Sequence, residues 1–397
     1  MIQTIIEICI YLIFALVMYW LAKKYAENNP EGESWDKYLI CFILFFSLIV
    51  GIRWMVGVDC NSYIRMFALG LDTGYEETEK EYLWKYFVNM IHDHDIHWSV
   101  GLAVTGFIQI FFITATVKRY PYILMMIPFV MFGGRYWIDL NSAVRQMTVA
   151  CGFLWASKFI YSRSLWKYLL FVFLAMQIHA SAIILLPLYL LPRKLSLENR
   201  RITLTITLVV CFLIGQTPSY QNLMNHVGGI LEATGYSDYT DIATSLIKQG
   251  ETKEALKFGP MMLTYLLIPI FIIWCGPAIK KEFGENIPYF NLWYNFAFLY
   301  ACLYFLVCNI SHLFIRPVMY LSLFQMVMAS ILLYYVVKHK KESVHSQVLA
   351  YAFMLIICTN TVWNIQKSTG VKDETATYKT FFMHKNEYHR WGLPIVI

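Results

Sequence analysis

Long apolar runs follow one another along this chain of 397 residues, and they constrain its fold more than any other feature. A helix needs about 20 apolar residues to cross the hydrocarbon core of a bilayer. Hydrophobic residues make up 58% of the chain and charged residues only 15%, whereas about 25% of the residues of soluble domains are charged. The sequence therefore predicts an all-α, polytopic integral membrane protein.

The predicted membrane spans are the apolar runs bounded by polar or basic residues. One further apolar stretch, 167–191, differs from these runs because Gln177, His179 and Ser181 interrupt it near its middle. The expected spans are 3–22, 37–52, 99–117, 121–138, 143–160, 202–216, 259–275, 290–309, 313–337 and 346–363.

The basic residues indicate how the stretch 167–191 lies in the membrane. Lys and Arg concentrate in cytoplasmic loops, and basic clusters at 158–167 and 193–201 flank this stretch. Both clusters lie on the cytoplasmic side if the stretch contains two short helices that meet near His179. The alternative is a single tilted helix with a buried polar patch. The broken form predicts about 11–12 transmembrane helices with both termini outside. The simplest organisation is a single membrane domain, 1–397.

Two long polar segments, 53–98 and 217–258, fall outside in this topology, and each is expected to carry short amphipathic helices. A C-terminal tail begins at about residue 364. The aromatic residues of the first outer segment could stack on sugars or form an interfacial belt. They are Trp54, Tyr63, Tyr75, Tyr82, Trp84, Tyr86 and Trp98.

Ionisable residues near the outer ends of the spans are the candidate functional residues, because charges at membrane depth are costly and usually serve function. Arg145 and Arg316 are the most informative, since each is followed by a long apolar run. Guanidinium binds phosphate through two parallel hydrogen bonds, so several arginines in one outer cavity favour a lipid-linked diphosphate as ligand. Snorkelling side chains or a structural pair, such as Arg135 with Asp139, are the alternative.

Three segments resemble motifs of one bacterial family, in matching order. GIRWMVGVDCNSYIRMF contains the pattern G-x-R-x-x-x-G-x-D-x-x-x-Y, NSAVRQMTVACGFLWASKF resembles a helix that begins with Arg-Gln, and IHASAIILLPLYLL resembles an H-x-S-A segment. These motifs are similar to those of the EpsG-like family of bacterial exopolysaccharide proteins, over residues 40–335.

The resemblance implies a Wzy-like polysaccharide polymerase with a multi-spanning, GT-C-like glycosyltransferase architecture. Such a protein would lie in the bacterial inner membrane, with its active site facing the periplasm or the outside. It would transfer an undecaprenyl-diphosphate-linked glycan onto the non-reducing end of another lipid-linked repeat unit. The expected partners are these donor and acceptor lipids, the bilayer and a chain-length-regulating co-polymerase. No nucleic acid, cofactor or metal is expected.

Residue roles follow from this chemistry and from the motif positions. Arg145 and Arg316 are expected to stabilise the departing diphosphate. His179 or Asp59 would act as general base, although His179 could equally bind backbone carbonyls freed by the break. The expected substrate-binding residues are Arg53, Tyr63, Arg135, Asp139, Gln146, Ser181, His312 and Tyr320.

Other functions fit part of the sequence. A lipid-linked oligosaccharide flippase also needs a cationic cavity, but alternating-access transporters usually consist of repeated halves, and the sequence shows no internal repeat. An O-antigen-ligase-like glycosyltransferase would use the same donor with another acceptor, and the sequence does not separate it from a polymerase. A membrane acyltransferase would use a histidine but would leave the outer arginines unexplained.

Overall fold

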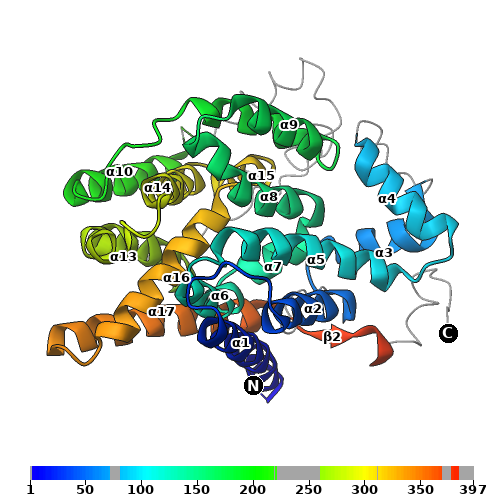
Figure 1. Ribbon diagram of the computed structural model, residues 1–397, viewed down its shortest axis with the longest axis horizontal. Coiled ribbons are helices and arrows are strands. Elements are labelled where there is room, and N and C mark those ends of the chain that lie inside the picture. Colours follow the sequence, from blue (N-terminus) through cyan, green and yellow to red (C-terminus); the bar gives the residue numbers. More distant parts are fainter. Residues whose placement is uncertain are drawn as a thin grey trace. The chain divides into compact units, whose positions relative to one another are not determined.

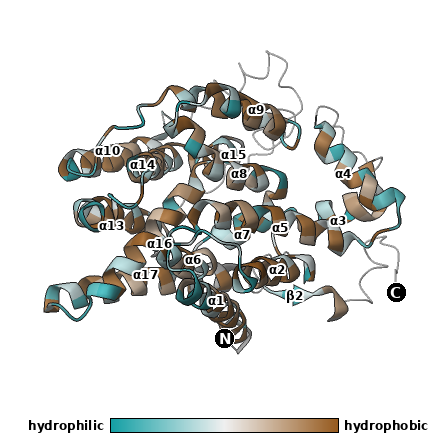
Figure 2. Cartoon of the chain, in the orientation of Figure 1, coloured by the Kyte–Doolittle hydropathy of each residue, from teal (hydrophilic) through white to brown (hydrophobic). Residues whose placement is uncertain are grey.

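The computed structural model is almost entirely helical (Figure 1). It describes residues 2–71, 81–218, 220, 260–310, 312–368 and 377–383. The chain divides into two compact units, with Met1–Leu191 and Leu333–Ile397 in unit 1 and Pro192–Leu332 in unit 2. Apolar residues cover the helices of both units, and polar residues concentrate at helix ends and connections (Figure 2). The predicted all-α, polytopic membrane class is confirmed, while the single membrane domain and the GT-C-like architecture stay predictions.

Unit 1 contains the outer segment 53–98, the interrupted stretch 167–191 and the C-terminal tail. Its helices α2 and α5 pack closely through glycines: a Cβ at Gly106 would lie 2.7 Å from Cβ of Val50. Its elements are α1 (Ile2–Asn28), α2 (Lys37–Gly51), β1 (Arg53–Trp54), α3 (Cys60–Leu69), α4 (Tyr82–Asp93), α5 (Trp98–Val117), α6 (Pro121–Gly133), α7 (Tyr136–Ser142), α8 (Val144–Tyr161), α9 (Leu165–Met176), η3 (Ala180–Leu190), α17 (Val344–Ser368), β2 (Lys379–Thr380) and η5 (Phe381–Met383).

Unit 2 is held together by α14, which packs against α10, α13 and α15. A partly buried ion pair adds to this packing, because Nζ of Lys280 lies 2.7 Å from Oε1 of Glu198. Its elements are α10 (Arg201–Gly215), α13 (Pro260–Phe283), α14 (Phe290–Val307), α15 (His312–Met319) and most of α16 (Ser322–His339), whose last turns belong to unit 1.

Six of the described helices are long and apolar enough to cross a membrane, and α6 with α7 could form a seventh span that is bent by 74°. Four further apolar helices, α2, α9, η3 and α10, are shorter. The predicted total of 11–12 crossings therefore requires that these shorter helices cross as well, and a twelfth crossing requires α8, the predicted span 143–160, which is not among these helices.

Two segments predicted as unbroken spans, 121–138 and 313–337, are interrupted in the structure. The first breaks where α6 ends at Gly133 and Gly134 adopts an extended backbone. The second breaks after α15, where Leu321 donates to the carbonyl of Val318 in a turn. Both runs are apolar enough on average to be read as single spans, although they contain Arg135 and Arg316, and hydropathy does not record the direction of the backbone.

The stretch 167–191 is broken near His179, as predicted. Helix α9 ends at Met176, His179 is extended (φ −151°, ψ 113°), and the chain continues as the 3-10 helix η3. The two arms fold back on each other, because the Tyr168 hydroxyl donates to the carbonyl of Leu185 at 2.6 Å. Arg163 closes the open end of this hairpin by donating to the carbonyl of Tyr189 at 2.5 Å. The single tilted helix is therefore wrong.

The outer segment 53–98 is a folded part of unit 1, with the predicted short helices present as α3 and α4. Trp54, Trp84 and Trp98 are buried in a small core that these helices form with the start of α5. Tyr63 is buried in the same core. These four buried side chains do not form an exposed stacking surface or an interfacial belt, while the predicted contact of Tyr63 with substrate stays a prediction. Tyr82 and Tyr86 are exposed, and Tyr75 and most of 217–258 lie outside the described residues.

The C-terminal tail folds back onto unit 1, which the sequence did not predict. Strand β2 pairs antiparallel with β1, with Arg53 opposite Thr380. The Tyr378 hydroxyl donates to the carbonyl of Ile49 at 2.7 Å, and its backbone N–H donates to Oε2 of Glu7 at 2.8 Å. Figure 1 shows β2 beside α2. Residue Tyr378 near the C-terminal end thus contacts Glu7 in the first turns of α1, and the side of the membrane on which the termini lie stays a prediction.

The hairpin predicts that the residues before and after it lie on the same side of the membrane. In a variant without the native cysteines, Ser162→Cys and Leu190→Cys should react with a membrane-impermeant maleimide from the same side. Asp95→Cys should react from the opposite side, because Asp95 precedes α5, Ser162 follows α8, and these two helices run in the same direction. Labelling of Ser162→Cys and Leu190→Cys from opposite sides would contradict the hairpin.

Candidate functional site

A buried carboxylate, Glu81, joins three segments that are far apart in the sequence. Glu81 caps the start of α4, and only 2% of its surface is exposed. Its Oε2 forms an ion pair with Nη1 of Arg145, near the start of α8. Its Oε1 lies 2.9 Å from Nδ1 of His179 and accepts a hydrogen bond of 2.9 Å from the N–H of Ala180. Glu81, Arg145 and His179, together with Tyr63, are called the Glu81 cluster below.

The break between α9 and η3 explains why Glu81 binds there. A helix end leaves backbone groups without partners inside the helix, and within a membrane protein such groups must be satisfied by other parts of the protein. Glu81 accepts from Ala180 at the start of η3, and the N–H of Trp84 donates to the carbonyl of Gln177 at 3.1 Å. The start of α4 therefore satisfies both sides of the break.

Tyr63 attaches α3 to the same site. Its side chain is 5% exposed, and its hydroxyl oxygen accepts a hydrogen bond of 3.5 Å from the backbone N–H of Arg145. This N–H lies in the first turn of α8, where the helix itself offers no acceptor. Arg145 is thus held through its backbone by Tyr63 and through its side chain by Glu81.

The charges of the cluster stabilise one another. Burial raises the pKa of Glu81, but the His179 hydrogen bond and the Arg145 charge outweigh it, so the pKa lies below its ordinary value. Glu81 is therefore ionised at neutral pH, and the stability that it contributes is lost only when acid protonates it. An ionised carboxylate only accepts hydrogen bonds, so Nδ1 of His179 must carry the proton toward Glu81. In a neutral imidazole, this tautomer leaves the basic lone pair on Nε2.

Arg53, predicted to bind substrate, is fully buried in its own loop. It donates to the carbonyl of Val50 at 2.7 Å and to that of Val56 at 3.3 Å. The next residue in the loop, Gly57, has φ +96°, and a Cβ there would lie 2.3 Å from the carbonyl oxygen of Asn141. These contacts dock the loop onto α7 and give Arg53 a structural role, while its contact with substrate stays a prediction.

Arg135 and Asp139 form the pair that the sequence offered as the structural alternative. Nε of Arg135 lies 2.8 Å from Oδ1 of Asp139 along α7, with the arginine side chain 37% exposed and the aspartate 9%. This spacing of four residues places both side chains on one face of the helix. A role in substrate binding for this pair stays a prediction.

The other predicted site residues belong to the two units of the chain. Asp59 immediately precedes α3, where its carbonyl accepts from the N–H of Tyr63 at 3.2 Å. Gln146 is buried beside Arg145 in α8, and Ser181 is half-buried near the start of η3. His312, Arg316 and Tyr320 belong to unit 2, so their contribution to a site with Arg145 stays a prediction.

Sequence reasoning missed Glu81. It stands in the acidic run YEETEKEY, which offers four glutamates without distinguishing one from another. Burying a charge without a partner is costly. A buried Arg145 therefore implies an acidic partner, although this argument does not say which acid it is. Among the residues that the structure describes, no group of three or more His, Cys, Asp or Glu side chains could hold a metal ion.

Comparison with known proteins identifies one family. The model of the EpsG family matches residues 36–380, which is most of the chain and includes the whole Glu81 cluster. No curated protein and no solved structure matches the chain.

The buried ion pair predicts a large effect of removing its acid. Glu81→Ala should destabilise the protein by about 3–5 kcal/mol, because it leaves Arg145 as a buried charge without its carboxylate. Thermal unfolding of the detergent-purified protein measures the change. The control is Glu27→Ala, since Glu27 pairs with Lys24 at an exposed site where such pairs contribute little. Equal unfolding midpoints for the two variants would show that the Glu81 pair does not stabilise the fold.

Proposed function

Because the chain belongs to the EpsG family, we propose that it is a Wzy-like polysaccharide polymerase of the bacterial inner membrane. It transfers a glycan from undecaprenyl diphosphate onto the non-reducing-end hydroxyl of a second lipid-linked repeat unit. The family links the chain to exopolysaccharide synthesis. The observation that carries the proposal is the Glu81–His179 pair beside Arg145, since it combines a base with a cation at a break in the membrane helices.

His179 is the general base of this reaction. The acceptor hydroxyl gives its proton to Nε2 of His179 while its oxygen attacks the anomeric carbon of the donor glycan. Glu81 fixes the tautomer through Nδ1 and stabilises the imidazolium that forms, as carboxylates do in other acid–base pairs. The bond between the anomeric carbon and the diphosphate oxygen breaks, and the diphosphate leaves with the electron pair.

Arg145 stabilises the negative charge that accumulates on the departing diphosphate. A cation fixed in a partly dry site can stabilise such charge without reorganisation during the reaction. The ion pair with Glu81 uses Nη1, and a guanidinium carries five N–H donors in a rigid plane, so Glu81 orients the group as well as balancing its charge. Arg316 is the proposed second cation, contributed by unit 2.

The diphosphate leaving group supplies the energy, so the reaction needs no nucleotide. A reaction that needs no nucleotide can take place at a site facing the periplasm or the outside, where nucleotides are not supplied. We place the Glu81 cluster on that side, with the basic hairpin ends near 163 and 193 in the cytoplasm.

His179→Gln tests the base. The purified variant should extend lipid-linked repeat units more slowly by a factor of about 10²–10⁴, as expected when a general base is lost. Glutamine keeps an N–H donor for Glu81, so the unfolding midpoint should change little. His94→Gln is the matched control, because His94 is exposed on the same outer segment. Normal polymer length from His179→Gln at wild-type protein level would exclude His179 as the base, and wild-type protein that extends no chain in detergent would favour a flippase.

The double variant Glu81→Gln with Arg145→Gln tests the cation without leaving a buried charge unpaired. Removing both charges should keep the protein folded, because no buried charge is left unpaired and two glutamine amides can hydrogen-bond each other and the groups around them. Polymerisation should fall by about 10²–10³ or more, since the stabilisation of the leaving diphosphate by Arg145 and the support of His179 by Glu81 are both lost. Polymer sizing in cells, with the protein level measured by immunoblot, checks this. Polymer of normal length would show that Arg145 does not serve the reaction.

A further inference from the structure

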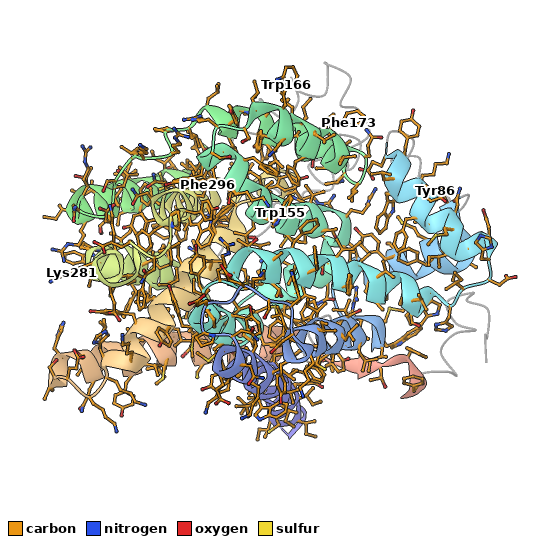
Figure 3. The ribbon with its side chains drawn as sticks, in the orientation of Figure 1. Tyr86, Trp155, Trp166, Phe173, Lys281 and Phe296 are labelled. Carbon is orange, nitrogen blue, oxygen red and sulfur yellow. The ribbon has the colours of Figure 1, made fainter. Side chains whose placement is uncertain are left out.

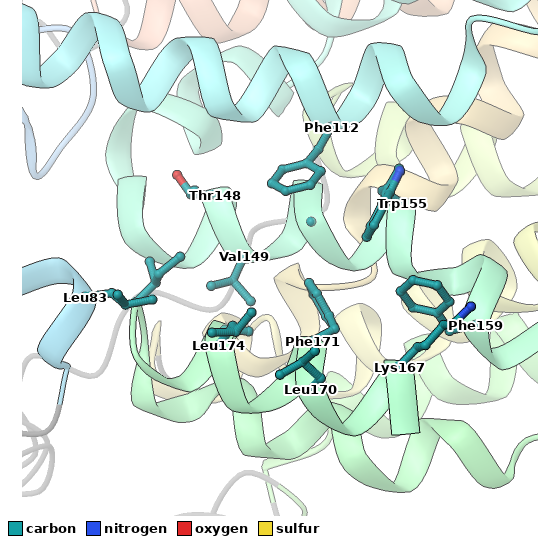
Figure 4. A pocket seen from close by; sticks show the side chains of 13 residues that line it. Leu83, Phe112, Thr148, Val149, Trp155, Phe159, Lys167, Leu170, Phe171 and Leu174 are labelled. Carbon is teal, nitrogen blue, oxygen red and sulfur yellow. The ribbon is translucent and has the colours of Figure 1, made fainter. Parts of the chain in front are cut away.

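An apolar groove in unit 1 lies between α8 and α9, and Phe112 of α5 enters its lining from above in the view of Figure 4. Its volume is about 460 Å³. Thr148 and Lys167 carry the polar side chains of its lining, and the remaining lining residues are apolar or glycine, with aromatic rings from Phe112, Trp155 and Phe171. A sugar in this groove would find few hydrogen-bond partners, and burying unpaired hydroxyl groups is unfavourable. The lining therefore favours a hydrocarbon ligand.

One end of the groove lies close to the Glu81 cluster, although the residues of the cluster do not themselves line it. Leu83 follows Glu81 by two residues, Thr148 follows Arg145 by three, and Ile178 directly precedes His179, so each charged residue has a close neighbour in the lining. Figure 4 shows Leu83 and Thr148 at this end and Phe159 with Lys167 at the other. Along α8, the distance from Thr148 to Phe159 is about 16 Å at 1.5 Å per residue.

Gly152 keeps the middle of the groove open. A Cβ at this position would lie 3.0 Å from Cε2 of Phe171 and 3.8 Å from Cε2 of Phe112. Any larger side chain on this face of α8 would enter the space between the two rings. The groove is thus continuous from the charged end to the lysine end because of this glycine.

We propose that the groove binds the polyisoprenoid chain of the lipid-linked substrate, with the phosphates held at the Glu81 cluster; this rests on the proposed function. Arg145 at one end of the groove complements an anionic headgroup. A single groove receives one chain, so it suits a lipid with one long hydrocarbon tail better than a two-chain phospholipid. The part of the tail that the groove does not hold lies in the hydrocarbon core of the bilayer, between the Glu81 cluster and the lysine end.

Neighbouring positions on α9 offer a matched test of binding. Leu174 lines the groove, whereas Phe173 is not among the lining residues and projects outward (Figure 3). Both side chains are exposed, at 45% and 59%, so either position should accept the photoreactive amino acid p-benzoylphenylalanine. The full-length protein is placed in phosphatidylglycerol nanodiscs that contain undecaprenyl phosphate as probe. Irradiation followed by mass spectrometry then identifies the adducts.

The groove predicts that the undecaprenyl phosphate adduct forms at position 174 and much less at position 173. Equal adducts at both positions would overturn the proposal, because they would reflect general contact with lipid. A phosphatidylglycerol adduct at 174 that added undecaprenyl phosphate does not reduce would also overturn it, since the groove would then hold an ordinary phospholipid, for example with its headgroup at Lys167.

A kinetic measurement separates this proposal from the proposed function. Leu174→Trp should raise KM for the lipid-linked substrate by about tenfold, equivalent to about 1.4 kcal/mol of binding, and leave kcat similar, while Phe173→Trp should change neither. An active polymerase without the adduct at 174 and with unchanged KM would remove the groove proposal and keep the polymerase. An adduct at 174 in a protein without polymerase activity would keep the lipid groove and remove the polymerase.

Discussion

The carboxylate of Glu81 is buried, and this burial constrains how unit 1 is assembled. A buried charge must be paired and hydrogen-bonded, because the cost of removing it from water is otherwise several kcal/mol, on the order of 3–5. Arg145 pairs with one oxygen, and His179 with the N–H of Ala180 binds the other. The start of α4, the start of α8 and the break between α9 and η3 are therefore fixed together. A change in any one of them leaves a buried polar group of the other two without its partner.

The broken hairpin and the outer segment depend on each other. Irregular backbone at membrane depth is tolerated only where the protein satisfies its polar groups, and the residues around α4 do this through Glu81 and the N–H of Trp84. The outer segment is in turn held by β1, which pairs with the C-terminal strand β2. The outer segment 53–98 and strand β2 of the C-terminal tail, which the sequence presents as a loop and a tail, thus stabilise the break between α9 and η3.

Hydropathy predicted most helices, because a membrane helix requires a local apolar run of sufficient length. Charge predicted the hairpin, because the basic clusters on either side of it share the cytoplasmic side only if an even number of crossings separates them. The breaks at Gly134 and Leu321 were missed because each lies inside a run whose average hydropathy stays high, even though Arg135 and Ser322 directly follow them. Glu81 was missed for another reason: its partners lie 64 and 98 residues away, and the surrounding glutamates give the same local signal. Arg145 and His179 were found because each interrupts an apolar run, which is the kind of feature that one sequence reveals.

The motif of the outer segment combines two kinds of residue. Arg53 binds carbonyls of its own loop, and Gly57 permits both a positive φ and close contact with Asn141. Tyr63, by contrast, reaches the backbone of Arg145. Because the loop positions α3, and α3 carries Tyr63, replacing Gly57 would disturb the Glu81 cluster without touching any reacting group. Loss of polymer alone therefore does not identify a catalytic residue in this motif, and a role in the chemistry requires that the variant also keeps its fold.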